Sequence, residues 1–201
     1  MKSPKSDSEK KRAAIQIIGG MPGVERLLRG ETRVVSVPKA GLLRELRLGN
    51  GLVTADDFRT AFKHAGMKTS IRANDILDNP SLIALAQIEK KERDVELVIA
   101  TPHELGCLTP PTLEEVCMCA MRFGLIRCTP EIGPQLRVQY PNQSKGEWLV
   151  IAMKPITRMD GYIHLYQVAH HADGLFLCAT NVPTEHRFDM HTKFVFMKSS
   201  A

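Results

Sequence analysis

The hydrophobic pattern of this chain changes its period near residue 130, and this change constrains the fold more than any other feature. Before residue 130, apolar side chains recur every three or four residues, as on the buried stripe of an α-helix. After it, they recur at every second residue or form short apolar runs, as in β-strands. The pattern predicts an α+β protein: an N-terminal helix-containing α/β half, then a C-terminal antiparallel β-sheet of about five strands.

Two helices of the first half carry clear start signals. One begins at Thr54, which forms a capping-box pattern with Asp57, and the other begins at Thr112, which pairs in the same way with Glu115. The second helix is expected to bury a stripe that includes Met121. Three shorter elements are expected in the same half: a helix at 70–77, a strand at 95–100 and a strand at 125–128.

The residues Thr101-Pro102-His103-Glu104 directly follow the strand expected at 95–100. They offer a capping hydroxyl, a proline at the first helical position and an acid at the third. This order predicts a further helix start, in which Glu104 caps backbone amides.

Short apolar or alternating segments fill the last third of the chain, separated by turn residues such as Asp160-Gly161 and Asp173-Gly174. Because the connections are short, we expect an antiparallel meander. The five expected strands are Leu136–Tyr140, Glu147–Met153, Tyr162–Ala169, Leu175–Ala179 and Lys193–Met197.

The chain divides by composition into three regions. Residues 1–12 form a basic tail with nothing to bury and are expected to be disordered. A mixed α/β region follows at 13–128, and an antiparallel β region at 129–201. Only Thr129-Pro130 separates these two regions, so they form either two domains or, as we favour, one shared core.

Most of the formal net charge of +5 lies in the tail, where five basic side chains face two acidic ones. Such a tail can contact nucleic acid weakly and without specificity, or it can simply keep the chain soluble. The basic residues concerned are Lys2, Lys5, Lys10, Lys11 and Arg12.

The five cysteines are an odd number in a chain large enough to fold without cross-links, which argues against a disulfide framework. No apolar run reaches the roughly 18 residues that cross a bilayer, and no apolar segment of a signal peptide follows the basic start. A cytoplasmic protein with reduced thiols and no membrane contact is expected. Cys117 and Cys119 diverge by about 200° on a helix, so no metal or cofactor is expected there.

Three candidate ligand-binding residues lie in the first two expected strands. If Leu136 and Val138 face the core, Arg137 and Gln139 lie on the opposite face, where Glu147 of the next strand is a partner for the guanidinium. Such an Arg–Glu pair binds a ligand in some proteins and only stabilises the sheet in others.

A second candidate surface lies along the expected strand Tyr162–Ala169. Tyr162, His164 and Tyr166 share one face of this strand, opposite Ile163 and Leu165. If the aliphatic face packs on the core, the other face is exposed and can stack a base or hold a small ligand. It can equally lie under a loop or helix.

Histidines concentrate in the last 40 residues, together with two aspartates. They suggest an acid–base or metal-assisted site, although none has the spacing of a helical zinc motif, and surface histidines are the simpler interpretation. The residues are His164, His170, His171, Asp173, His186, Asp189 and His191.

Two segments of the chain carry a recognisable signature. They are Gly133-Pro134-Gln135-Leu136-Arg137-Val138-Gln139-Tyr140 and Gly146-Glu147-Trp148-Leu149-Val150-Ile151-Ala152-Met153-Lys154-Pro155-Ile156-Thr157. The signature resembles that of a family of uncharacterised bacterial proteins. The resemblance implies no activity, fold or cofactor, and it assigns no functional residue.

A non-enzymatic binding or interaction module, with a protein among its possible partners, is the function that the sequence favours. No phosphate loop, nucleophile–base pair or metal spacing stands out to support an enzyme. Two alternatives stay open: a small metal-assisted or hydrolase-like enzyme that uses the C-terminal His and Asp residues, and nucleic-acid binding through the tail and a Tyr/Arg sheet face. The candidate ligand-binding residues are Arg137, Gln139, Glu147, His164 and Tyr166.

Overall fold

The computed structural model describes residues 41–78, 92–157 and 162–199. Every described residue belongs to the unit that spans residues 37–201. The tail expected at 1–12 lies outside the described residues. The described part holds four helices and eleven strands, which confirms the α+β class.

Helices and strands occur throughout the described part of this unit. The helices are α3 (Ala55–His64), α4 (Ile71–Leu77), α6 (Leu113–Met121) and α7 (Ile132–Gln139). The strands of the main sheet are β1 (Gly41–Leu48), β2 (Lys68–Thr69), β3 (Arg93–Ala100), β4 (Leu125–Ile126), β5 (Trp148–Ile151), β8 (Tyr166–His171), β9 (Gly174–Ala179) and β11 (Phe194–Lys198). A small second sheet contains β6 (Ile156–Thr157), β7 (Tyr162–His164) and β10 (Val182–Pro183).

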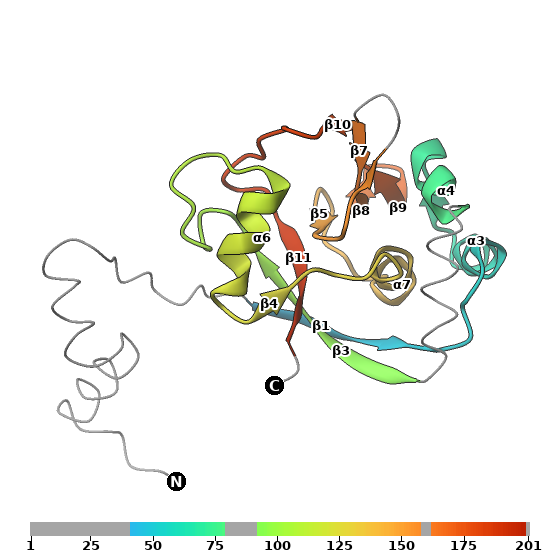
Figure 1. Cartoon of the computed structure of the whole chain (residues 1–201). Helices are drawn as coiled ribbons and strands as arrows, with labels where there is room; N and C mark the ends of the chain where they lie inside the picture. Colours follow the sequence, from blue (N-terminus) through green and yellow to red (C-terminus); the bar gives the residue numbers. More distant parts are fainter. Residues whose placement is uncertain (1–40, 79–91, 158–161, 200–201) are drawn as a thin grey trace, which may run out of the picture. The chain divides into compact units, whose positions relative to one another are not determined.

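The main sheet is mixed, and its strand order does not follow the chain. Its order is β1-β3-β11-β5-β8-β9-β2, with β4 beside β11. β11 is parallel to β5 and β2 is parallel to β9, so the expected simple antiparallel meander is wrong. The reason is that β11 returns to lie between β3 and β5, where it joins strands that precede residue 130 to strands that follow it (Figure 1).

The capping boxes of the first half are confirmed. The Thr54 hydroxyl accepts a hydrogen bond from Asp57 N, and the Asp57 carboxylate accepts one from Thr54 N at 2.7 Å. Thr112 and Glu115 form the same reciprocal pair at the start of α6. Met121 does not lie on the buried stripe of α6, since 68% of its surface is exposed.

The expected helix start at Thr101 is a hydrogen-bonded turn. Glu104 does cap as predicted, because its carboxylate accepts from Thr101 N at 2.8 Å and its own amide donates to the Thr101 hydroxyl. The turn then closes through Cys107 N, which donates to Pro102 O at 3.0 Å. Gly106 between them has a φ of +76°, which ends the helical path after one turn.

The expected strand Leu136–Tyr140 is wrong, because this segment belongs to α7. Alternating Leu136 and Val138 imitate a strand over four residues, but Ile132 and Leu136 lie four apart and are both fully buried. Pro134 suits the first turn of a helix, where its missing amide hydrogen has no partner to lose.

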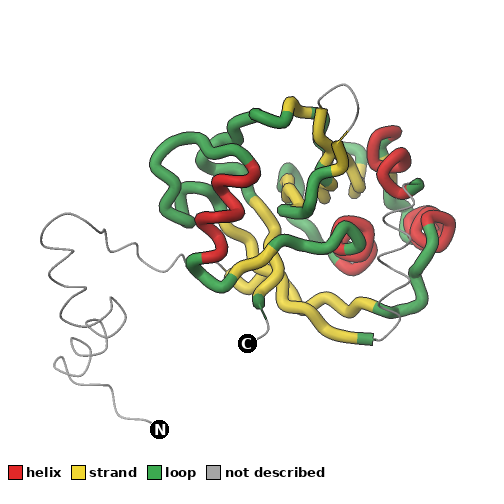
Figure 2. The backbone as a smooth tube through the Cα atoms, in the orientation of Figure 1, coloured by secondary structure: helices red, strands yellow, loops and turns green. Residues whose placement is uncertain are grey.

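Helix α7 packs directly against β8. A Cβ atom built on Gly133 would lie 2.5–2.7 Å from atoms of Tyr166, so only glycine fits this contact. Figure 2 shows α7 together with α3 and α4, apart from α6. One buried cluster unites side chains from before and after residue 130, among them Phe58, Leu97 and Val168.

Among the described helices, the longest has ten residues, and none combines the length and apolar character that crossing a membrane requires.

Candidate functional site

Arg137 lies fully buried beneath β8. Its guanidinium donates to the Gln143 side chain, to Ala169 O at 3.3 Å and to Tyr140 O. Burial lowers the pKa of Arg137 to about 10. The expected pair with Glu147 is wrong, because the Glu147 carboxylate instead accepts from Tyr140 Oη at 3.1 Å and Lys193 Nζ at 2.9 Å.

Gln139 lies at the outer edge of β1. Its carboxamide accepts from Arg47 N at 3.1 Å and donates to Arg47 O at 2.9 Å, so it pairs with the strand as another strand would. This contact covers part of a sheet edge that could otherwise pair with a second chain. A structural role therefore accounts for its position.

His164 and Tyr166 lie on different strands, because the extended segment breaks at Leu165. Their expected exposure is wrong: His164 is 5% exposed and Tyr166 is fully buried. His164 Nδ1 donates to Thr180 O at 2.6 Å. The Tyr166 hydroxyl has no hydrogen-bond partner among the described residues, and burial raises its pKa above the ordinary value.

The C-terminal histidines lie apart from one another rather than around one centre. His170 contacts Gln143 O, His186 packs on Phe188, and His191 packs on His103. Within the described ranges, no three His, Cys, Asp or Glu side chains are grouped so that they could hold a metal ion.

A partly exposed aromatic surface, not predicted from the sequence, lies on the β5–β8–β9 part of the main sheet. Trp148 is opposite Ala169, and Ala169 is opposite Phe176, so these side chains share one face with Gln167 and His171. Trp148 is 45% exposed, and Gln167, His171 and Phe176 are half-buried. We call the surface formed by Trp148, Gln167, His171 and Phe176 the Trp148 face.

A row of rings crosses the Trp148 face. The centroids of Trp148 and His171 are 4.5 Å apart with an interplanar angle of 74°, and those of His171 and Phe176 are 4.7 Å apart at 73°. Lys68 Nζ lies 5.3 Å from the Phe176 centroid and 3.0 Å from Asp173. The hydrogen bond from Lys68 lowers the pKa of Asp173, which keeps this pair charged.

A hollow of about 400 Å³ adjoins Trp148. Its polar lining includes Gln167 from β8 and Thr192 and Lys193 from the segment before β11, while Val150 supplies apolar surface. The only charged pair in its lining joins Lys193 to Glu147. The hollow thus combines a partly exposed indole with several hydrogen-bonding groups, which is a usual composition for a small-ligand site.

A thiol also lies on this part of the sheet. Cys178 Sγ is 3.8 Å from His171 Nε2, on the side of the sheet that carries Trp148. Burial raises the pKa of Cys178, although Arg137 acts in the opposite direction. A thiol that holds its proton is a poor nucleophile, so the contact alone does not make an activated cysteine.

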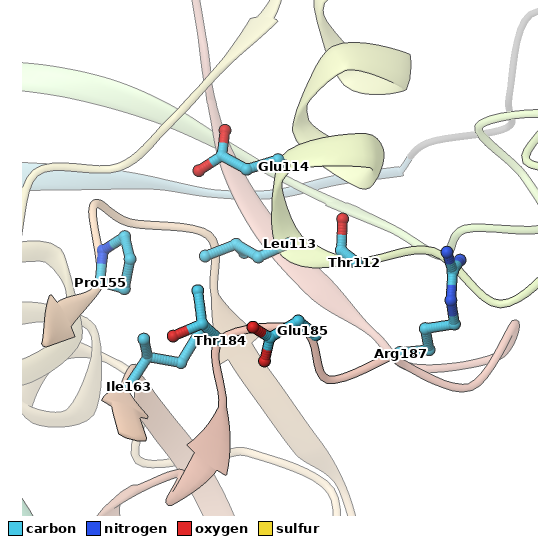
Figure 3. Close-up of a pocket in the computed structure, with 8 residues that line it drawn as sticks. All are labelled: Thr112, Leu113, Glu114, Pro155, Ile163, Thr184, Glu185 and Arg187. Carbon is cyan, nitrogen blue, oxygen red and sulfur yellow. The ribbon is translucent and has the colours of Figure 1, made fainter. Parts of the chain in front are cut away.

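A second hollow, of about 310 Å³, lies between α6 and the small sheet (Figure 3). Leu113, Pro155 and Ile163 give it apolar walls, and in this view the carboxylates of Glu114 and Glu185 lie on opposite sides of Leu113. Glu114 pairs with Arg127, so much of its charge is already neutralised. No aromatic residue lines this hollow, which makes it the weaker candidate for binding a ring-shaped ligand.

A signal for the Trp148 face was present in the sequence. The turn Asp173-Gly174 predicts a tight hairpin that places Phe176 opposite His171; in the structure the turn lies one residue earlier and Phe176 pairs with Ala169, which is on the same face as His171. The position of Trp148 beside them depends on the pairing of β5 with β8, which no short-range pattern reveals.

Comparison of the chain with protein-family models, curated proteins and solved structures found no match. The geometry of the site is therefore the basis for assigning a function.

Proposed function

We propose that this protein is a non-enzymatic binding module that holds a sugar against the Trp148 face. The observation that carries this proposal is the 45% exposure of Trp148 beside a hollow of about 400 Å³. The space is within the size range of small-ligand sites.

The chemistry of the lining favours a sugar. An indole presents a flat apolar surface, which matches the carbon–hydrogen face of a pyranose ring. The hydroxyl groups around such a ring both donate and accept hydrogen bonds, and the Gln167 amide, the Thr192 hydroxyl and the Glu147 carboxylate supply complementary groups. When a sugar covers these groups, its hydroxyl groups supply the hydrogen-bond partners that water supplied before.

The charges near the Trp148 face favour an uncharged ligand. Lys193 is paired with Glu147, and Lys68 is paired with Asp173. A phosphate that approached either lysine would bring its negative charge close to the carboxylate of Glu147 or Asp173, at a cost in free energy. A neutral sugar can bind while both pairs stay intact.

The test uses Trp148, the single tryptophan of the chain, as its own reporter. Titration with a panel of neutral mono- and oligosaccharides is expected to change its fluorescence, with saturation at dissociation constants near about 1 mM or below. Nucleosides serve as ring compounds of a different class in the same assay. If no sugar alters the fluorescence or gives heat in calorimetry, the proposal is wrong.

Matched variants locate the binding. Trp148→Thr keeps a residue suited to a strand but removes the ring, and calorimetry is expected to show at least about tenfold weaker sugar binding. Tyr162→Thr removes a similarly exposed aromatic side chain from the small sheet and is expected to leave binding unchanged.

The contact between Cys178 and His171 favours a second candidate function, a hydrolase-like enzyme. In that case His171 would take the proton of Cys178 while the sulfur attacks an acyl carbon, the leaving group would depart with that proton, and water would then hydrolyse the thioester. Alkylation by iodoacetamide tests this directly, because an activated Cys178 reacts faster than a simple thiol and slows in a His171→Ala variant. Unreactive Cys178 in the native protein would exclude this candidate.

The cellular setting that we propose is the bacterial cytoplasm, because the five cysteines include no bonded pair and the signature resembles that of bacterial proteins. Weak nucleic-acid contact through the tail at 1–12 is a separate proposal. Binding of mixed-sequence RNA at low salt, compared between the full chain and one lacking residues 1–12, tests it. Equal binding by the two chains would contradict a role for the tail.

A further inference from the structure

Two thiol groups meet where α6 passes the turn that follows β3. Cys107 Sγ and Cys119 Sγ lie 3.2 Å apart. Both residues are partly exposed, so a small molecule in solution can reach them. A disulfide bond is about 2.05 Å long, and the sulfurs therefore need to approach by only roughly a further 1.1 Å.

Backbone hydrogen bonds hold Cys107 in place. The turn closes through Leu105 N to Thr101 O and Cys107 N to Pro102 O, both at 3.0 Å. The Leu105 side chain is 1% exposed and anchors the turn in the core. The position of the Cys107 sulfur is thus set by the fold rather than by a free loop.

Cys119 is held equally well by α6. The capping box of Thr112 and Glu115 fixes the start of this helix, and Val116 and Ala120 are fully buried on its inner side. Because each sulfur is carried by an anchored segment, little conformational freedom is lost when they join.

The other cysteines are placed differently. Cys117 and Cys128 are buried, and Cys128 Sγ donates to Val195 O at 3.3 Å. Cys178 has His171 as its neighbour. Cys107 and Cys119 are the two that combine exposure with a neighbouring sulfur in the described residues.

A zinc site is a poorer explanation of the same pair. Two sulfurs 3.2 Å apart, each about 2.3 Å from a zinc ion, would subtend only about 90° at the metal, less than a tetrahedral angle. The described residues also supply no third ligand group around them.

We propose that Cys107 and Cys119 are a site of reversible disulfide formation, oxidised by a low-molecular-weight disulfide such as oxidised glutathione. This proposal does not depend on the sugar site. In the first step the Cys119 thiolate attacks one sulfur of glutathione disulfide, whose S–S bond breaks and releases one glutathione thiolate, which takes up a proton. In the second step the Cys107 thiolate attacks the Cys119 sulfur, and the second glutathione leaves. The protein gives up two protons and two electrons, and one disulfide is reduced to two thiols.

The roles of the two sulfurs follow from their contact. The Cys107 thiol is the donor of the contact and the Cys119 sulfur is the acceptor. Burial, reinforced by Cys119, raises the pKa of Cys107 to about 12. Because the Cys107 thiol holds its proton more tightly than an ordinary thiol, we assign Cys119 as the attacking sulfur and Cys107 as the resolving one.

The test incubates the full chain with excess oxidised glutathione, blocks remaining thiols by alkylation and maps the peptides by mass spectrometry. The expected product is a peptide pair joined between Cys107 and Cys119, with a mass lower by two hydrogen atoms, while Cys117 and Cys128 are alkylated only after unfolding. Excess reduced glutathione is expected to restore both thiols. Persistently free thiols at Cys107 and Cys119, or a bond from either to another cysteine, would overturn the proposal.

Three variants test the order of the steps. Cys107→Ser is expected to trap glutathione on Cys119, because the resolving thiol is missing, whereas Cys119→Ser should take up little glutathione on Cys107. Cys178→Ser serves as the matched control and should form the Cys107–Cys119 bond at the native rate. Equal trapping in the first two variants would contradict the assigned roles.

Discussion

The two faces of the β8–β9 hairpin differ in what their side chains contact. On one face Tyr166, Val168 and Leu177 are fully buried, and Gly133 of α7 lies directly against Tyr166. On the other, the Trp148 face, rings and amides stay partly exposed. We call the buried face the closed face, and its burial stabilises the fold. The Trp148 face instead keeps large side chains partly exposed, which folding alone does not require.

The largest effect is expected from the network behind the closed face. Arg137→Ala should lower the free energy of unfolding by about 3 kcal/mol, because it leaves the Gln143 side chain and the Tyr140 and Ala169 carbonyls without their donor. Urea denaturation followed by circular dichroism measures the loss. The pair of substitutions Arg137→Met and Gln143→Leu should lose less, since it removes donor and acceptor together; equal losses would contradict this account.

A somewhat smaller loss is expected where α7 touches the sheet. Gly133→Ala should lower the free energy of unfolding by about 2 kcal/mol, because its Cβ would lie within 2.5–2.7 Å of Tyr166 atoms. Urea denaturation again gives the measurement. In a Tyr166→Ala background, which removes the Cγ and Cδ2 atoms nearest to the new Cβ, the same substitution should cost less, and an unchanged cost there would show that the ring is not the obstacle.

High pH should weaken the closed face through Tyr166. The pKa of the folded tyrosine is raised, so only the unfolded chain ionises when the pH passes the ordinary value of about 10, and the stability present below that pH is lost above it. From pH 9 to pH 11 this loss amounts to about 1.4 kcal/mol.

Comparison of the native chain with Tyr166→Phe isolates this loss. Arg137 changes the free energy of unfolding in the opposite direction. Because its pKa is lowered to about 10 in the folded protein, the folded state gains stability as the pH rises above that value. Both proteins contain Arg137, so its effect cancels in the comparison. Denaturation curves at pH 9 and pH 11 should show the extra loss in the native chain only. Parallel behaviour of the two proteins would contradict the burial of the hydroxyl.

The smallest effect on stability is expected at the Trp148 face. Trp148→Thr should change the free energy of unfolding by less than about 1 kcal/mol, because nearly half of the side chain is already exposed and threonine suits a strand. Thermal denaturation checks this. A loss as large as that of Arg137→Ala would show that Trp148 belongs to the core of the fold, and would remove the contrast between the two faces.

Elements with local signals could be predicted from the sequence, and those that depend on distant contacts could not. The starts of α3 and α6 were predictable because a hydroxyl and a carboxylate three residues apart satisfy the first turn wherever it lies. The short run of alternating residues in α7 imitates a strand and obscures the helical spacing of Ile132 and Leu136. The position of β11 depends on strands far away in the chain, which no local pattern encodes.

The positions of the candidate site residues also depend on distant contacts that the local sequence does not encode. The sequence predicts Glu147 as a partner of Arg137, but the structure places it beside Trp148 in the lining of the larger hollow. His164 and Tyr166 were expected on one exposed face, but the break at Leu165 sends them to different sheets. Strand periodicity predicts which side chains alternate, but burial depends on what packs on each face.

The central place of β11 has a consequence for how the protein is made. During synthesis the β8–β9 hairpin can pair at once, and β1 can pair with β3. The facing edges of β3 and β5 gain their shared neighbour only when Phe194–Lys198 has been translated, and until then each edge can recruit a strand from another nascent chain. The delay between the synthesis of β5 and that of β11 is thus the interval in which the two halves of the sheet are open to aggregation.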